Sequence, residues 1–317
     1  MREINFITIG DKNFFPFINV SIKQVLKIYP TSKFFIYDWG FTPSQKKKIN
    51  TYSNTILIDW ADKLDREHGY KKIKKTYYRD TLIKIQRKME YLYNQKPFCI
   101  LDCAKRIREN LIFFDGDVIL INPIDEIFED NYDIGLTVRF RKNILKGLSN
   151  LKWGINSGVI FFKLNSKPMQ IFIQEWINEI NTSDLLLMEQ TSLVTLIKDR
   201  NKEIFNNNSN SGIIKISDTE FKIKAFPIPI YNFYRIIEGY NDKKVKILHF
   251  NTIKYYNPNL SKSLIIRDYI RQIKISYPFF QILKLVSPIL SPKIYSKIRR
   301  SFKSFLIYRK KKRIYSF

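Results

Sequence analysis

The chain has 317 residues, of which 44% are hydrophobic and 15% aromatic, with only 10 glycines. This composition excludes a disordered or collagen-like protein and predicts a globular chain that can bury a large core. Its formal charge of +26, from 55 Lys and Arg against 29 Asp and Glu, indicates an anionic partner such as nucleic acid, a phosphorylated substrate or acidic lipid.

Short apolar runs alternate with helical patterns at the start of the chain. Their order is strand, helix, strand, helix, strand, at residues 4–9, 17–29, 33–37, 43–51 and 55–58. This alternation predicts an α/β fold with a mostly parallel sheet, right-handed crossovers and helices on both faces.

The same alternation continues through the middle of the chain. A long helical pattern at 76–93 and a polar stretch at 102–110 precede a strand that ends at residue 114. Further strands are predicted at 134–138 and 159–162, helices at 169–180 and 189–198, and a polar, Asn-rich surface loop at 201–211. We therefore expect one α/β domain over residues 1–258.

Cysteine content and hydropathy indicate the compartment. Cys99 and Cys103 are spaced neither as a redox Cys-x-x-Cys nor as half of a zinc ribbon, so we expect both to be reduced and structural. The first ten residues have no long apolar signal-peptide core, and no run of about 18 uncharged apolar residues occurs. These features predict a cytoplasmic protein that does not span a membrane.

Two aspartates, Asp115 and Asp117, separate two apolar runs in the segment LIFFDGDVILINPIDEIF. The run before them predicts a strand buried on both faces, so the pair should follow its carboxyl end, where open α/β sheets bind ligands. We expect Gly116 to let the chain turn sharply, so that both carboxylates converge on a hard cation such as Mg²⁺ or Mn²⁺. A solvated Asp-Gly turn is the alternative for this motif alone.

Three later segments bear on the aspartate pair. WGINSGVIFF, from residue 153, places a small polar turn before a predicted strand, and VKILHFN, from residue 245, ends another strand with His249, one of only two histidines. Between them lies the pair Glu189 and Gln190.

With these residues the chain resembles the nucleotide-diphospho-sugar glycosyltransferases of the GT-A fold, most nearly the glycogenin-like and lipooligosaccharide galactosyltransferase group, family 8-like. In that group a strand ends in Asp-x-Asp, an Asn-Ser-Gly-Val segment follows some forty residues later, an Asp-Gln pair comes next, and a His ends a late strand. The order and the approximate spacing match over residues 1 to about 257.

The resemblance implies roles for individual residues. Asp115, Asp117 and His249 would be ligands or outer-shell partners of Mn²⁺ or Mg²⁺, which would neutralise charge on the departing nucleoside diphosphate. Asn156, Ser157 and Gly158 would line the sugar site, and Glu189 and Gln190 would lie near the anomeric carbon. Asp11 and Asn13 would contact the base and ribose of a UDP-sugar donor. For each, the alternative is an ordinary polar turn, loop or helix surface, or for His249 a core histidine.

Some positions depart from the family pattern. Glu189 replaces the Asp of the Asp-Gln pair, and a carboxylate there could also serve as a base in an inverting enzyme. The segment from His249 lacks the family's glycine and has one residue fewer before Lys254, which makes a diphosphate clamp at this lysine doubtful. Lys84, Arg106 and Arg108 could meet phosphate, although solvated cations are the simpler interpretation in so basic a chain.

The end of the chain has a different character, and we treat 259–317 as a basic amphipathic helical tail. Residues 278–317 contain seven Lys, four Arg and no Asp or Glu, and so carry +11 of the total +26. Apolar residues recur at helical spacing among them, including Phe302, Phe305 and Leu306. This pattern is typical of a helix on an anionic membrane surface, or of a packed helix with solvated charges.

The sequence thus predicts a metal-dependent glycosyltransferase that moves a sugar from a nucleotide sugar, expected to be UDP-linked, to a hydroxyl of a cell-surface glycan or a lipid-linked saccharide. It would lie peripherally on the inner face of the cell membrane and would bind no nucleic acid. One alternative is a haloacid dehalogenase-like phosphatase, in which the first aspartate is a nucleophile. Another is a non-enzymatic protein that binds anionic membranes or nucleic acid, although no RNA-recognition signature, zinc finger or heptad zipper occurs.

Overall fold

The computed structural model describes residues 4–61, 93–138, 154–164, 168–182, 188–201, 210–233 and 244–250. Almost all of the helix expected at 76–93, most of the loop expected at 201–211 and the whole tail at 259–317 lie outside these residues, as do Lys84 and Lys254. Every other predicted strand and helix lies within them and is present.

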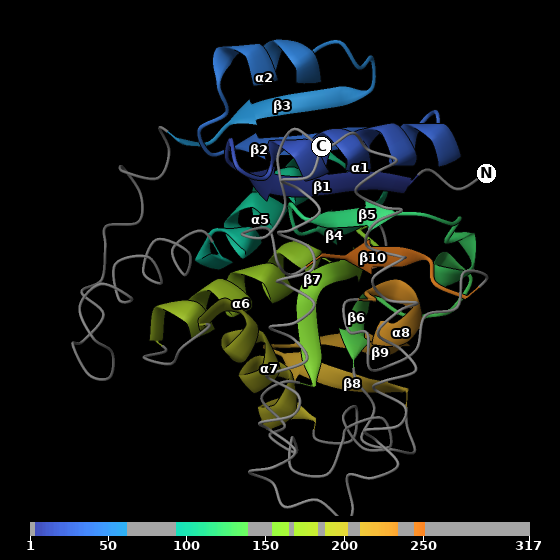
Figure 1. The fold of residues 1–317 in the computed structure, drawn as a ribbon. Coiled ribbons are helices and arrows are strands. Elements are labelled where there is room, and N and C mark those ends of the chain that lie inside the picture. The colour runs from blue at the N-terminus through green and yellow to red at the C-terminus, as the bar shows by residue number, and fades with distance from the viewer. Residues whose placement is uncertain are drawn as a thin grey trace, which may run out of the picture.

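An eight-stranded sheet runs through the molecule in the order β3-β2-β1-β4-β7-β6-β9-β8, as Figure 1 shows from top to bottom. Parallel pairs join β3-β2, β2-β1, β1-β4 and β6-β9, whereas β7 and β8 pair antiparallel to their neighbours. The predicted α/β class with a mostly parallel sheet is therefore confirmed. The strands are β1 (Ile4–Gly10), β2 (Phe34–Asp38), β3 (Thr55–Asp59), β4 (Asn110–Phe114), β6 (Ile134–Val138), β7 (Ile155–Phe162), β8 (Ser211–Ile216) and β9 (Thr219–Pro227).

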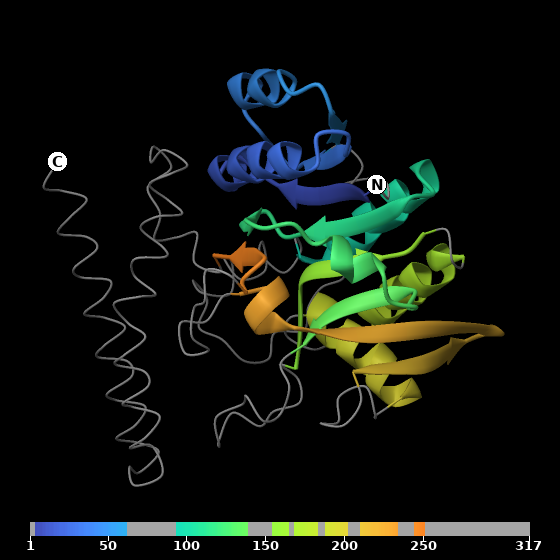
Figure 2. The ribbon, with the colours of Figure 1, turned by 90° about the vertical axis from the view of Figure 1, so that its right-hand side faces the viewer.

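Helices cover both faces because side chains of the central strands alternate between two buried clusters. On β1, Ile4 and Phe6 pack with α1 (Phe15–Ile28) and α2 (Pro43–Ile49), whereas Ile7 and Ile9 pack with α5 (Lys96–Arg106), α6 (Met169–Thr182) and α7 (Met188–Arg200). Figure 2 shows α1 toward one side of the sheet and α6 and α7 toward the other. Cys99 and Cys103 of α5 form no disulfide and are buried in the second cluster, as expected of reduced, structural cysteines.

Two short antiparallel strands form a second sheet, separate from the eight-stranded one. It joins β5 (Val118–Leu120) to β10 (Ile247–His249), with His249 opposite Val118. A 3-10 turn, η1 (Asp125–Phe128), follows β5, and the short helix α8 (Ile228–Tyr231) precedes β10. This pair brings residues more than 120 positions apart in the sequence to the end of β4.

Three parts of the fold differ from the sequence prediction. The stretch predicted as polar at 102–110 includes the second half of α5, which begins at Lys96. The strand predicted at 159–162 begins at Ile155, and the β8-β9 hairpin was not predicted. In the described part of the chain, no helix has both the length and the apolar character that crossing a membrane requires.

Candidate metal centre

Asp115 directly follows β4, whose residues 111–114 are fully buried. Its backbone N–H donates to the carbonyl of Gly158 over 2.9 Å, and its own carbonyl accepts from the N–H of Val118 over 3.0 Å. These two bonds close the Asp-Gly-Asp turn against β7. The pair therefore lies at the carboxyl end of a central strand, as the apolar pattern predicted.

Gly116 lets the turn form without a Cβ clash, as we expected, although it needs no left-handed backbone conformation. Its φ lies outside the left-handed region. A Cβ at this position would lie 2.7 Å from Cδ1 of Phe14 and 3.0 Å from the carbonyl oxygen of Ile9. The segment after β1 therefore lies directly on the Asp-Gly-Asp turn.

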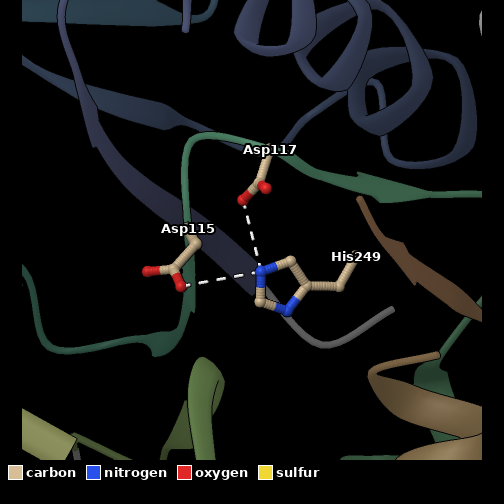
Figure 3. A group of neighbouring side chains, drawn as sticks. All are labelled: Asp115, Asp117 and His249. Carbon is tan, nitrogen blue, oxygen red and sulfur yellow. Dashed lines mark ion pairs between the residues drawn. The ribbon is translucent and has the colours of Figure 1, made fainter. Parts of the chain in front are cut away.

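His249 reaches the aspartates from β10. Its Nε2 lies 3.2 Å from Oδ1 of Asp117 and 3.8 Å from Oδ2 of Asp115, so one ring nitrogen faces both carboxylates (Figure 3). The N–H of Phe250 donates to the carbonyl of Asp117 over 3.1 Å. Backbone and side chain both connect the end of β10 to the turn.

These three side chains fit a divalent cation. Each offers one ligand atom, and the three atoms lie within 4.8 Å of one another. Two carboxylates and one imidazole form a mixed N/O donor set of the kind that Mn²⁺ accepts. Burial lowers the pKa of His249, but the negative charges of Asp117 and Asp115 outweigh burial and raise it. A cation would take the place of the proton that these carboxylates attract.

Lys96, the first residue of α5, is the principal site residue that the sequence did not reveal. Its side chain is 3% exposed, and its Nζ lies 3.0 Å from Oδ1 of Asp115 and 3.2 Å from Oε2 of Glu189. It also donates to the carbonyl and hydroxyl oxygens of Ser157. Burial lowers the pKa of Lys96, but the two carboxylates outweigh it and raise the pKa. Among 55 basic residues, its one distinguishing feature in the sequence is its place directly before the short apolar run at 97–101.

Glu189 is buried, unlike the helix-surface residue that the alternative interpretation expected. Its Oε2 accepts from Ser157 Oγ over 3.0 Å as well as from Lys96. Burial raises the pKa of Glu189 to about 7, although the nearby Lys96 opposes this shift. Its Oε1 is buried without a hydrogen-bond partner among the described residues. An acceptor of this kind can bind a ligand hydroxyl.

The segment Asn156, Ser157 and Gly158 lies within β7 and not in a turn before it. The register with β6 shifts here, because Leu136 pairs with Ile160 whereas the next residue, Thr137, pairs with Asn156. At this irregularity the Ser157 hydroxyl contacts Lys96 and Glu189, whereas the Asn156 side chain contacts Asn232. Ser157 N–H lies 3.4 Å from Oε1 of Gln190, so both predicted groups, 156–158 and 189–190, meet beside the cluster.

Other predicted residues lie apart from this cluster. Asp11 and Asn13 follow β1 at the same edge of the sheet and hydrogen bond to each other through the Asn13 backbone N–H and side-chain amide. Their contact with base and ribose stays a prediction. Arg106 and Arg108 precede β4, at the opposite end of that strand from Asp115, and Arg106 pairs with Asp102. This position argues against either arginine as a phosphate ligand.

The sequence matches no protein-family model and no curated protein. Several solved structures are similar in fold. The galactosyltransferase LgtC is 11% identical, with a TM-score of 0.47 over 78% of this chain and 86% of that one. The glycosyltransferase GlyE of Streptococcus pneumoniae is 13% identical, with 0.48 over 86% and 64%. Mouse xyloside xylosyltransferase 1 is 13% identical, with 0.44 over 78% and 98%.

Proposed function

We propose that this chain is a glycosyltransferase of the GT-A type, which transfers a sugar from a UDP-linked donor to a hydroxyl of a glycan or lipid-linked acceptor. The observation that carries the proposal is the meeting of Asp115, Asp117 and His249 at the carboxyl edge of the sheet, beside the buried Lys96 and Glu189. This combines a cation site with polar groups that can bind hydroxyls, as a nucleotide sugar requires.

The balance of charge favours a cation. Three carboxylates, of Asp115, Asp117 and Glu189, face the ammonium of Lys96 and the imidazole of His249. Above the raised pKa of Glu189 all three carboxylates are negative, and one negative charge remains even with both bases protonated. Mn²⁺ or Mg²⁺ held by Asp115, Asp117 and His249 would supply Lewis-acid stabilisation of the leaving nucleoside diphosphate.

Lys96 and Glu189 would act on the sugar side of the site. Lys96 holds Ser157 and Glu189 in place through three contacts of 3.1–3.2 Å. The unpartnered Oε1 of Glu189 would accept a hydrogen bond from a sugar hydroxyl, and this would orient the anomeric carbon. Gln190 would lie near that carbon. Retention and inversion are both compatible with a carboxylate and an amide at these positions.

A binding screen tests the donor class. The chain should bind UDP and UDP-sugars more tightly with Mn²⁺ than without it, and calorimetry with a panel of nucleotide sugars would identify the preferred donor. A haloacid dehalogenase-like phosphatase would show no Mn²⁺-dependent binding of UDP, and a non-enzymatic binding protein would turn over no donor. Either result would refute the proposal.

We further propose that the basic tail holds the enzyme on the anionic inner face of the membrane, where a lipid-linked acceptor would be present. This rests on the sequence of residues 278–317, with its eleven positive charges and no acidic residue. Each Lys or Arg near an anionic leaflet contributes about 1 kcal/mol. Several together would give stable but salt-dependent binding.

A further inference from the structure

A buried polar network lies behind His249, on the side away from the aspartates. Asn232 is fully buried, and its Oδ1 lies 2.8 Å from Nδ1 of His249. Its side-chain nitrogen donates to Oγ1 of Thr137 over 2.7 Å and to Oδ1 of Asn156 over 2.9 Å. Apart from the ring of His249, these contacts involve none of the three proposed cation ligands.

Two backbone groups determine the direction of every hydrogen bond in this network. The N–H of Gly158 can only donate, and it donates to Oδ1 of Asn156 over 2.9 Å. The carbonyl of Asn156 can only accept, and it accepts from the hydroxyl of Thr137 over 2.7 Å. Both Oδ1 of Asn156 and Oγ1 of Thr137 are therefore acceptors toward Asn232. Its NH₂ group must face them.

This orientation determines which nitrogen of His249 carries the proton. With its NH₂ turned to Thr137 and Asn156, Asn232 presents its carbonyl oxygen to the imidazole. A carbonyl oxygen only accepts, so Nδ1 must be the donor. In the neutral ring, the lone pair is then on Nε2, the nitrogen that faces Asp115 and Asp117.

Backbone bonds keep Asn232 at this distance from the ring. The N–H of Phe233 donates to the carbonyl of Ile247 over 2.9 Å, and the N–H of His249 donates to the carbonyl of Phe233 over 3.0 Å. The N–H of Lys246 donates to the carbonyl of Ile230 over 2.8 Å. The segment after β9 is thus paired with β10 on both sides of Asn232.

We propose that Asn232 is a positioning residue that holds neutral His249 with its proton on Nδ1 and its lone pair on Nε2, ready to bind the cation. This inference deepens the proposed function, because it rests on the cation site formed by His249 with Asp115 and Asp117. Without Asn232, the opposite tautomer would be preferred, since an Nε2–H could donate to Asp117. That tautomer has no lone pair on Nε2, the nitrogen that faces the cation site.

The tautomer can be read directly, without metal or substrate. The chain has only two histidines, His68 and His249, so ¹⁵N-histidine labelling gives two sets of ring signals, which His68→Gln assigns. Above the imidazole pKa, the ring of His249 should show its proton on Nδ1 in the parent chain and on Nε2, wholly or partly, in Asn232→Ala. Mn²⁺ binding, followed by electron paramagnetic resonance of the free ion, should weaken about tenfold or more in Asn232→Ala.

Two further variants separate this role from general damage to the fold. Asn232→Asp keeps an acceptor for Nδ1–H, so it should retain the Nδ1–H form and bind Mn²⁺ more tightly than Asn232→Ala. Thr137→Val removes one acceptor for the Asn232 amide and should shift the tautomer in the same direction, which keeps the test available if Asn232→Ala does not fold.

The ring tautomer and the Mn²⁺ affinity are independent measurements. An Nε2–H form in the parent chain, or an unchanged Nδ1–H form and Mn²⁺ affinity in both Asn232→Ala and Thr137→Val, would overturn the inference. A parent chain that shows the Nδ1–H form but binds no Mn²⁺ would refute the proposed cation site and still support the role of Asn232 in holding the ring.

Discussion

The ammonium of Lys96 lies 3.0 Å from the carboxylate of Asp115, although a helix and a strand separate the two residues in the sequence. α5 begins at Lys96 and β4 ends just before Asp115, so the two ends of this helix-strand unit meet at the same edge of the sheet. A buried permanent cation beside the aspartate turn offsets part of its charge, and it also joins the turn to Glu189 on α7.

Asp117→Ala should abolish metal-dependent UDP binding and leave the fold intact. Asp117 provides one of three ligands, and loss of a ligand should cost at least the 10-fold to 100-fold known for outer-shell partners. Calorimetry with UDP, with and without Mn²⁺, measures the effect. Asp218→Ala, at a fully exposed position, is the matched control and should behave as the parent. Unchanged Mn²⁺ response in Asp117→Ala would refute the ligand assignment.

Gly158→Ala should weaken Mn²⁺ binding because the new methyl group displaces His249. A Cβ at residue 158 would lie 2.4 Å from Cε1 and 2.8 Å from Nδ1 of this buried ring. Gly40→Ala is an informative control, because Gly40 has φ +111° and no atom within 4 Å of a Cβ. It should lower the melting temperature through backbone strain but leave Mn²⁺ affinity unchanged. Equal Mn²⁺ affinity in the parent, Gly158→Ala and Gly40→Ala would argue against close packing of residue 158 on the ring of His249.

Periodicity and spacing were sufficient to predict the α/β class and the ends of β4 and β10. Continuous apolar runs identify strands buried on both faces, and the carboxyl ends of such strands meet at one edge. Asp115 and Asp117 could therefore be expected at this edge from the apolar pattern, whereas His249 was expected beside them only from the resemblance to the glycosyltransferase group. The geometry now brings them within reach of one ion.

The supporting residues could not be predicted in the same way. Lys96 is one of 55 basic residues, and Asn232 follows a short helix in a segment without clear periodicity. Their roles depend on contacts between residues 17 to 93 positions apart. The β8-β9 hairpin was missed because its strands alternate Lys with Ile or Phe over only a few residues.

The tail gives a separate prediction about the membrane. The full chain should sediment with anionic liposomes more strongly at low salt than at high salt, since screening weakens its eleven positive charges. A variant that ends at Tyr277 should bind much less. Phe302→Ser together with Phe305→Ser would test shallow insertion, and should reduce binding at high salt most. Equal sedimentation of the full and shortened chains would show that the tail does not bind membranes.

Glu189→Gln should change how stability depends on pH. The pKa of Glu189 is raised from an ordinary 4.5 to about 7, chiefly by burial, so between these values the folded chain holds a proton that the unfolded chain has lost. The free energy of unfolding of the parent, relative to Glu189→Gln, should therefore fall by up to about 3 kcal/mol as pH rises through this window. Urea unfolding at about pH 5 and about pH 8 measures it. An equal difference at both pH values would contradict the raised pKa.

Gln190→Ala should reduce turnover far more than UDP affinity. Gln190 lies on α7 next to Glu189, and its Oε1 faces the N–H of Ser157 at 3.4 Å, a contact long enough to be exchanged for one with a bound sugar. If that contact forms mainly in the transition state, kcat should fall about 100-fold with little change in UDP affinity. Gln174→Ala, on the exposed surface of α6, is the matched control and should retain parental activity. Parental kcat in Gln190→Ala would leave Glu189 and Lys96 as the sugar-side residues, and a parallel loss of UDP affinity would indicate that Gln190 supports the binding of the donor nucleotide instead.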